Sequence, residues 1–316
     1  MELRQLRHFV GVVECGNVSR AAVELHITQP ALTRSIHILE EQVGAPLLHR
    51  SSRGVTPTEA GLLLLRHAKP ILNSLKTAEG DLQAFLCGVS GRLHVGVGAL
   101  FANCILDEAI ASLVAAHPDV TVKVTVGPFE EMADMLRDGY MHLAFSVAPQ
   151  EAVEGIAFEA LIDIHSHAVA ASDHPLVQSR EVSLEDLHKA RWALIDQRHM
   201  GAFMDGYFAP GGLPAPTNVV LTNSLELLRS LVRRGEFVTM LGASWIAEDL
   251  RRGELATIRA PGLPVQRKAG LLYREGSPSP MVAELFMQQI RAICADAVGP
   301  EAHYEPPALS RSATAQ

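Results

Sequence analysis

Apolar residues in the N-terminal part of the chain recur at helical spacing in several separate stretches. The first stretch predicts an amphipathic helix that ends at Gly16, and Asn17 or Ser19 can cap the helix that follows. The apolar face of the first helix consists of Leu3, Leu6, Phe9, Val10 and Val13. The apolar face of the second, shorter helix consists of Ala21, Ala22 and Leu25.

A third helix is predicted to begin at Pro30, after a tight turn that Ile27 fills. Proline suits the first helical position because its missing N–H would have no partner there. The buried side of this helix consists of Leu32, Ile36, Leu39 and Val43. The opposite side carries a polar row formed by Gln29, Thr33, Arg34 and His37. A polar row on a short, rigid helix is what readout of the DNA major groove requires.

The residues after this helix predict a small β-hairpin. Gly44 ends the third helix, and residues 46–58 read as two short strands around a turn at Ser52–Gly54. Helices followed by such a hairpin form a winged helix-turn-helix. Arg53 is expected at the tip of the wing.

A long helix is predicted to begin at Thr58, and it carries an apolar seam whose steps alternate between four and three residues. The seam consists of Leu64, Ala68, Ile71, Leu75, Ala78, Leu82 and Phe85. This heptad pattern is typical of a two-helix coiled coil, so we expect the seam to pair with a second copy of the chain. The alternative is a helix packed on its own domain. Pro70 removes one backbone hydrogen bond, and we expect a kink there.

Strands and helices alternate after a glycine-rich hinge near residue 90, which is an α/β pattern. The first strand has Leu93, Val95 and Val97 on one side. Further strands are expected at Val120–Val126, Leu143–Val147, Ser166–Ala170, Trp192–Ile195, Phe237–Leu241 and Gly270–Tyr273. Helices are expected at Ile105–Ala116, Glu130–Arg137, Leu184–His188, Leu225–Arg233, Ser244–Arg251 and Met281–Cys294. Residues 299–316 have little periodicity and predict a mobile tail.

Composition and charge narrow the class of protein. The chain has 316 residues, 48% hydrophobic and 20% charged, which allows two or three domains. The four cysteines lack CxxC spacing, so we expect reduced thiols in a cytoplasmic protein. No apolar run approaches the roughly 20 residues of a spanning helix, so we expect no membrane partner. The net charge is −8, yet residues 1–58 hold six arginines against five acidic residues. One near-neutral module makes few phosphate contacts, so specific duplex binding requires dimerisation.

Residues 3–72 resemble the N-terminal pattern of the LysR-type family of bacterial transcriptional regulators. The resemblance rests on the Ala-Ala pair, Thr-Gln-Pro-Ala-Leu, Leu-Glu, a glycine followed by Leu-Leu-x-Arg, and Thr-Pro-Thr-x-Ala-Gly, in this order and spacing. It implies a mainly-α winged helix-turn-helix domain over 1–58, with the helix-turn-helix itself at 18–37, and a linker and dimerisation helix with a hinge over 59–90. It also implies an α/β effector-binding domain over 91–298 with two Rossmann-like lobes, similar to periplasmic solute-binding proteins. Lobe I would cover about 92–162 and 268–296, and lobe II about 163–267.

The polar row predicts specific base contacts. A glutamine such as Gln29 can pair with adenine through two hydrogen bonds, and an arginine such as Arg34 can do so with guanine. The resemblance places DNA contacts on this row and on the wing. The expected DNA-binding residues are Thr28, Gln29, Pro30, Thr33, Arg34, His37, Arg50 and Arg53. The competing interpretation is a solvated helix face.

The C-terminal half is expected to hold a small-molecule effector between its lobes, where strand ends converge. The expected effector-binding residues are Ala99, Leu100, Phe101, Asn103, Phe129, Ser146, His165, Gln197, Arg198, Met200, Asn223 and Ser224. Two helix N-termini facing one cleft would favour an organic anion. Many relatives have Ser or Thr where this chain has the apolar residues 99–101, which favours an aromatic or branched carboxylate.

Other chemistries have weaker support. His165 and His167 lie two apart on one strand, which permits a two-ligand metal site, but no third ligand is near in sequence, and we expect structural or solvated histidines. No GxSxG or GxxxxGK[ST] motif occurs. The rival classes are an α/β enzyme or solute-binding protein that carries a helix-turn-helix, and a non-specific DNA-binding protein. We expect instead a regulator without a cofactor, controlled by an organic anion. Its partners would be promoter DNA, further copies in a dimer of dimers, and RNA polymerase if it activates.

Overall fold

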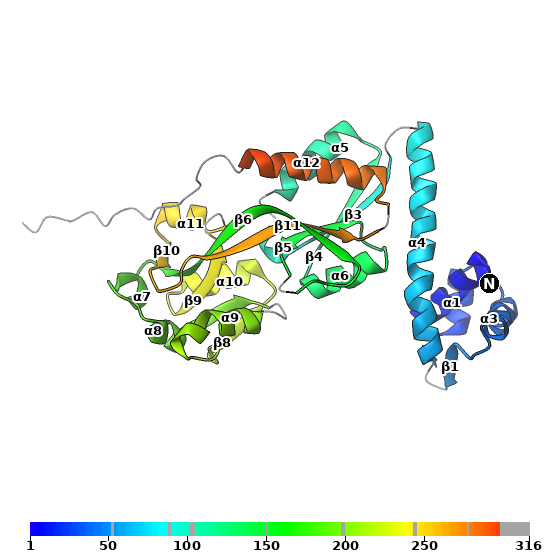
Figure 1. Ribbon diagram of the computed structural model, residues 1–316, viewed down its shortest axis with the longest axis horizontal. Coiled ribbons are helices and arrows are strands. Elements are labelled where there is room, and N and C mark those ends of the chain that lie inside the picture. The colour runs from blue at the N-terminus through cyan, green and yellow to red at the C-terminus, as the bar shows by residue number, and fades with distance from the viewer. Residues whose placement is uncertain are drawn as a thin grey trace, which may run out of the picture.

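The computed structural model describes residues 1–51, 54–87, 90–101, 105–149, 151–196, 200–242, 245–276 and 278–297. Figure 1 shows a small helical head, one long helix (α4, Glu59–Cys87), and an elongated α/β part on the other side of that helix. None of the helices in these ranges combines the length and apolar character needed to span a bilayer. The expected tail, 299–316, lies outside the described residues.

The head contains three helices and a two-stranded hairpin. Its elements are α1 (Leu3–Cys15), α2 (Val18–Glu24), α3 (Gln29–Val43), β1 (Leu48–Ser51) and β2 (Gly54–Pro57). Gly16 ends α1 in the left-handed conformation, and the Asn17 side chain accepts hydrogen bonds from two backbone N–H groups at the start of α2. The predicted helix-turn-helix and wing are therefore confirmed. The third helix begins one residue earlier than predicted, with Pro30 inside its first turn.

Two polar residues fasten the wing to the helices. Glu40 of α3 accepts hydrogen bonds from the backbone N–H groups of Leu47 (2.9 Å) and Leu48 (3.3 Å). The Thr58 hydroxyl donates to the Pro46 carbonyl at 2.7 Å and accepts from the N–H of Gly61 at 3.0 Å. A Cβ at position 61 would collide with the Leu47 carbonyl, so only glycine lets α4 cross the start of the wing. The Leu-Glu and Thr-Pro-Thr-x-Ala-Gly motifs thus hold the wing in place.

The helix α4 runs continuously through Pro70 and joins the head to the α/β part (Figure 1). Its first turns belong to the head, because Ala68 is fully buried in the head's own core and Leu64 packs against the same cluster. This corrects the predicted seam at Ala68, which finds its partners within the chain, whereas Leu64 keeps some exposure and its place in the seam stays a prediction. Further along, Ile71 and Leu82 are 44% and 63% exposed, respectively. Ala78 is also exposed, Leu75 is half-buried, and Phe85 has no described side chain.

The α/β part is built on one nine-stranded sheet in the order β4-β3-β5-β11-β6-β9-β7-β8, with β10 paired to β6. The strands are β3 (Gly91–Val97), β4 (Val120–Val126), β5 (Leu143–Val147), β6 (Ile156–Ala171), β7 (Arg191–Ile195), β8 (Val219–Thr222), β9 (Phe237–Gly242), β10 (Leu255–Ile258) and β11 (Val265–Arg274). The central strands β6 and β11 are antiparallel partners over ten residue pairs, from Ile156 opposite Arg274 to Ser166 opposite Val265. They pass from one half of the sheet to the other, so they are the two crossovers between the lobes.

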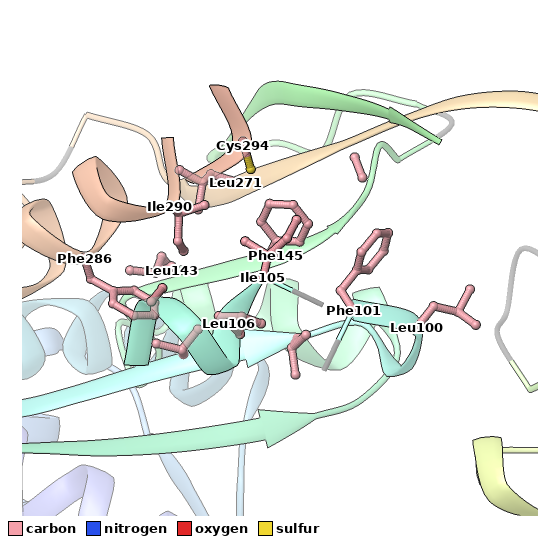
Figure 2. Packing of buried hydrophobic residues seen from close by; sticks show 14 of the residues in the cluster. Leu100, Phe101, Ile105, Leu106, Leu143, Phe145, Leu271, Phe286, Ile290 and Cys294 are labelled. Carbon is pink, nitrogen blue, oxygen red and sulfur yellow. The ribbon is translucent and has the colours of Figure 1, made fainter. Parts of the chain in front are cut away.

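Helices cover both faces of this sheet. They are α5 (Leu106–Ala116), α6 (Phe129–Arg137), α7 (Pro175–Gln178), α8 (Leu184–Lys189), α9 (Met200–Phe208), α10 (Leu225–Arg233), α11 (Ala247–Arg252) and α12 (Met281–Ala297), with two short 3-10 turns at Ala99–Phe101 and Ala209–Gly211. One core cluster spans both lobes, and Figure 2 shows its lobe I part, where Phe286 and Ile290 of α12 lie near Leu143, and Phe145 lies further along the cluster. A second cluster lies under α8 and α9, and a third under α6.

Most predicted elements of this region are confirmed. The helix Leu225–Arg233 and the strands Val120–Val126 and Leu143–Val147 have the predicted bounds. The strand predicted from Ser166 begins ten residues earlier at Ile156, and the helix predicted from Ser244 begins at Ala247, with Ser244 outside the described residues. The elements α7, α9, β8 and β10 were not predicted.

Lobe I is docked on α4 and on the head. The Lys69 ammonium on α4 lies 3.1 Å from Asp138 and 3.9 Å from Glu14 of α1, and it stacks over the Tyr140 ring at 5.3 Å. The Tyr140 hydroxyl donates to Glu14. Further along α4, Asp81 accepts from the N–H of Met281 at 3.0 Å. These contacts fix the position of the head relative to lobe I.

Candidate functional site

The polar row of α3 forms one hollowed, exposed surface. This surface is lined by Gln29, Pro30, Thr33, Arg34, His37, Ile38 and Glu41. Thr28 is the N-cap residue, and its hydroxyl makes no capping hydrogen bond, so it remains exposed at the start of the helix. The buried side chains of α3 are Leu32, Ile36 and Leu39, on the opposite side. The structure therefore brings the sequence-predicted residues of α3 together on one face.

The charge on this face is mixed. Arg34 is exposed, whereas the His37 ring lies 3.3 Å from the carboxylate of Glu41, four residues further along the helix. Ser35 faces away, because its hydroxyl is 2.8 Å from the His8 ring of α1. Arg34 is thus the exposed cation of the row, and His37 is engaged locally.

The wing follows α3 along the chain and is held to it through Glu40. Arg50 is exposed on β1 opposite Val55 of β2, and the N–H of Val55 donates to the Gly16 carbonyl at 2.9 Å. A Cβ at Gly54 would lie 2.7 Å from that same carbonyl oxygen, so the close approach of the wing to the end of α1 requires glycine. Arg53 lies outside the described residues.

In lobe I the loop after β3 is packed inward. Phe101 is only 3% exposed, and its ring meets Phe145 edge-on at 5.2 Å and Trp245 of lobe II at 5.3 Å. Figure 2 shows the Phe101 ring next to Phe145, with Leu100 further out and 8% exposed. Ser146 is buried on β5, where a Cβ at Gly98 would come within 2.8 Å of its hydroxyl. The apolar wall expected for a ligand is here in contact with lobe II.

The remaining predicted residues are spread over both lobes. Ser224 caps α10, its hydroxyl accepting from the N–H of Leu227 at 3.2 Å, and Asn223 beside it is exposed. Met200 is buried as the first residue of α9, and Phe129 is half-buried at the start of α6. The side chain of Ala99 is not described, and Asn103, Gln197 and Arg198 lie outside the described residues.

Several polar residues at the junction of the lobes lie on the crossover strands β6 and β11. His165 and His167 are half-buried on β6, and burial together with the neighbouring His165 lowers the pKa of His167. Within the described ranges no cluster of three or more His, Cys, Asp or Glu side chains could hold a metal. On the partner strand β11, Arg267 lies opposite Ile164 and stacks over the Phe203 ring at 4.6 Å. Arg267 was not among the residues predicted from the sequence, although its alternation with Val265 and Ala269 places it on their face of the strand.

Two family descriptions match the chain. Residues 3–62 match "Bacterial regulatory helix-turn-helix protein, lysR family", and residues 88–295 match "LysR substrate binding domain". The chain belongs to the LysR family. Its members are transcriptional regulators, not enzymes, with a DNA-binding helix-turn-helix and a domain that binds small-molecule effectors.

The chain is also similar to individual transcriptional regulators in sequence and in structure. The chain is 30% identical over 294 residues to the HTH-type transcriptional regulator GalR of Pseudomonas putida, covering 92% of this chain and 74% of that one. ArgP of Mycobacterium tuberculosis has a TM-score of 0.72 at 22% identity, covering 92% and 96% of the two chains. Full-length CbnR in complex with its target DNA has a TM-score of 0.62 at 23% identity, covering 93% and 100%. At these identities the structures show that this LysR-family regulator shares their fold.

Proposed function

We propose that this LysR-family regulator binds promoter DNA specifically through α3 and the wing, as a dimer of dimers in the cytoplasm. The observation that carries the DNA-binding part is the shared exposed face of Gln29, Thr33 and Arg34 on a helix whose other side is core. Arg34 would read guanine and Gln29 adenine, while Thr28 and Arg50 would contact phosphates. If the regulator activates transcription, RNA polymerase is a further partner.

Exposed apolar side chains support assembly with other copies. On α4 the C-terminal half of the seam keeps Ile71 and Leu82 exposed, as a helix pair would need. The outer strands of the nine-stranded sheet are β4 and β8, and they expose Val126 and Leu221, each 55% exposed. Unpaired apolar edge strands favour contact with another copy.

The proposed effector is a small organic carboxylate with an apolar or aromatic part, bound between the lobes. The apolar residue Phe101 and the lobe II residue Trp245 already meet at this junction, and the neighbouring Leu100 is also buried. A ligand that separates Phe101 from Trp245 would change how the lobes pack. This change is the population shift by which an effector would control DNA binding.

The test combines a DNA-binding and a ligand-binding measurement. Arg34→Ala should weaken binding to the native promoter by roughly 5- to 150-fold, the loss expected for one bidentate base contact, and relax base preference at one position. Arg180→Ala, an exposed arginine in lobe II, is the matched control and should bind like the wild type. Equal affinity of the wild type for promoter and scrambled DNA at moderate salt would contradict specific regulation.

A further inference from the structure

Arg267 lies where the cores of the two lobes meet. It is on the crossover strand β11, opposite Ile164 of β6. Ile164 packs against the core cluster shared by both lobes, whereas Val265, two residues before Arg267, packs against the lobe II cluster under α9. The guanidinium therefore occupies the junction of the lobes, on the face covered by α9.

The guanidinium has few partners. One of its Nη atoms donates to the Ser166 hydroxyl at 3.3 Å, and its plane stacks over Phe203. The Nε atom is fully buried and has no hydrogen-bond partner. The residue as a whole keeps some exposure, so the site is reachable from outside.

No carboxylate of the described residues forms an ion pair with Arg267. The neighbouring cation Lys268 points to the opposite face of the strand and lies 3.7 Å from Asp163. The acidic side chain of α9, Asp205, accepts from the N–H of Ala215 at 2.7 Å. The three residues before α9, 197–199, are Gln, Arg and His, so they supply no acid either.

A buried arginine without a carboxylate is costly, because the charge loses water and gains no counter-charge. Burial lowers the pKa of Arg267, yet a guanidinium stays charged at neutral pH. Its planar fork fits the two oxygens of a carboxylate, and such charge-assisted pairs are the stronger hydrogen bonds of proteins. An anion bound here would supply the counter-charge that the described residues do not.

We propose that Arg267 is the anchor for the carboxylate of the small organic effector, with Ser166 as the hydroxyl beside it and Phe203 holding the guanidinium plane. This assignment rests on the proposed function, which places an organic anion between the lobes. It adds the recognising residue, and it makes the carboxylate itself, rather than the apolar part, the feature that every effector must have.

The experiment follows the melting temperature of the full-length protein during titration with acetate and benzoate, and with benzamide as an uncharged mimic of benzoate, at constant ionic strength. The wild type should be stabilised by the carboxylates and not by benzamide. Arg267→Gln should need at least about tenfold more carboxylate for the same shift, the loss expected when a charge-assisted pair is removed. Arg267→Lys should fall between them, because an ammonium keeps the charge without the fork.

Lys268→Gln is the matched control and should respond like the wild type. Arg267→Met retains the apolar stem over Phe203 and replaces Arg267→Gln if the latter does not fold. An equal carboxylate response of wild type and Arg267→Gln, or no carboxylate response of the wild type, overturns the assignment. Binding to the native promoter is measured on the same samples. If Arg267→Gln without ligand binds the native promoter as tightly as the wild type does, the assignment is supported. If the wild type does not prefer promoter over scrambled DNA, the proposed function is refuted independently of the assignment.

Discussion

Glu40→Ala should detach the wing from the third helix without altering any residue of the proposed DNA-binding face. The Glu40 carboxylate accepts from the N–H groups of Leu47 at 2.9 Å and Leu48 at 3.3 Å, and these two residues are only 0% and 7% exposed. Hydrogen bonds to charged groups contribute about 1.5–3 kcal/mol each. The bond to Leu48 is longer and contributes less than the full value. The free energy of local opening of the wing should therefore fall by about 2–4 kcal/mol.

Amide hydrogen exchange measures this opening directly. A loss of 2–4 kcal/mol corresponds to faster exchange at positions 47 and 48 by roughly 30- to 1,000-fold. Glu40→Gln keeps a neutral acceptor and should show a smaller effect. DNA affinity should fall in step with protection, since the wing would no longer be held beside α3. Unchanged protection at these two amides in Glu40→Ala would refute the reasoning.

Three further predictions concern α4 and its contacts. Leu75→Asp combined with Leu82→Asp would place unpaired charge in the proposed helix pair, so light scattering should show a smaller oligomer and promoter binding should weaken; an unchanged oligomer would contradict the seam. Lys69→Met removes the ammonium between the head and lobe I, and small-angle scattering should show a larger radius of gyration than in the wild type. Burial lowers the pKa of His142 from 6.5 to about 4, so the unfolded chain takes up the proton first and stability should fall by about 3 kcal/mol as pH drops from about 6.5 to 4. In His142→Asn, which keeps an acceptor for the N–H of His94, the loss of melting temperature over this range should be clearly smaller.

Local patterns predicted local structure well. The face of α3 follows from helical spacing alone, and the bounds of Leu225–Arg233 follow from a serine N-cap before an amphipathic stretch. The wing follows from its turn residues. In each case the residues that decide the structure lie within a few positions of each other.

What failed depends on contacts between distant residues. Ala68 had the right spacing for the coiled-coil seam, but α1 and the wing already provide a core for this residue. The helix α9 is apolar nearly all round, so it lacks the polar face that marks a helix in sequence. The docking of Lys69 on Asp138 joins positions 69 residues apart, and no local signal reports it. Arg267 was overlooked because only the tertiary structure reveals a missing counter-charge.

The bonds described above between the head or α4 and the α/β part all end on lobe I, at Asp138, Tyr140 and Met281. By these bonds lobe I is attached to the head and to α4, and none of them reaches lobe II. If the proposed effector changes the angle between the lobes, the head would stay with lobe I, and the outer edge of lobe II, at β8, would be displaced relative to it. A neighbouring copy is proposed to bind at that edge. The displacement would therefore be passed to that copy, and it would reach DNA as a change in the spacing between the heads of different copies. Substitutions that silence the regulator while sparing ligand and DNA binding should accordingly gather on β8 and its proposed partner surface.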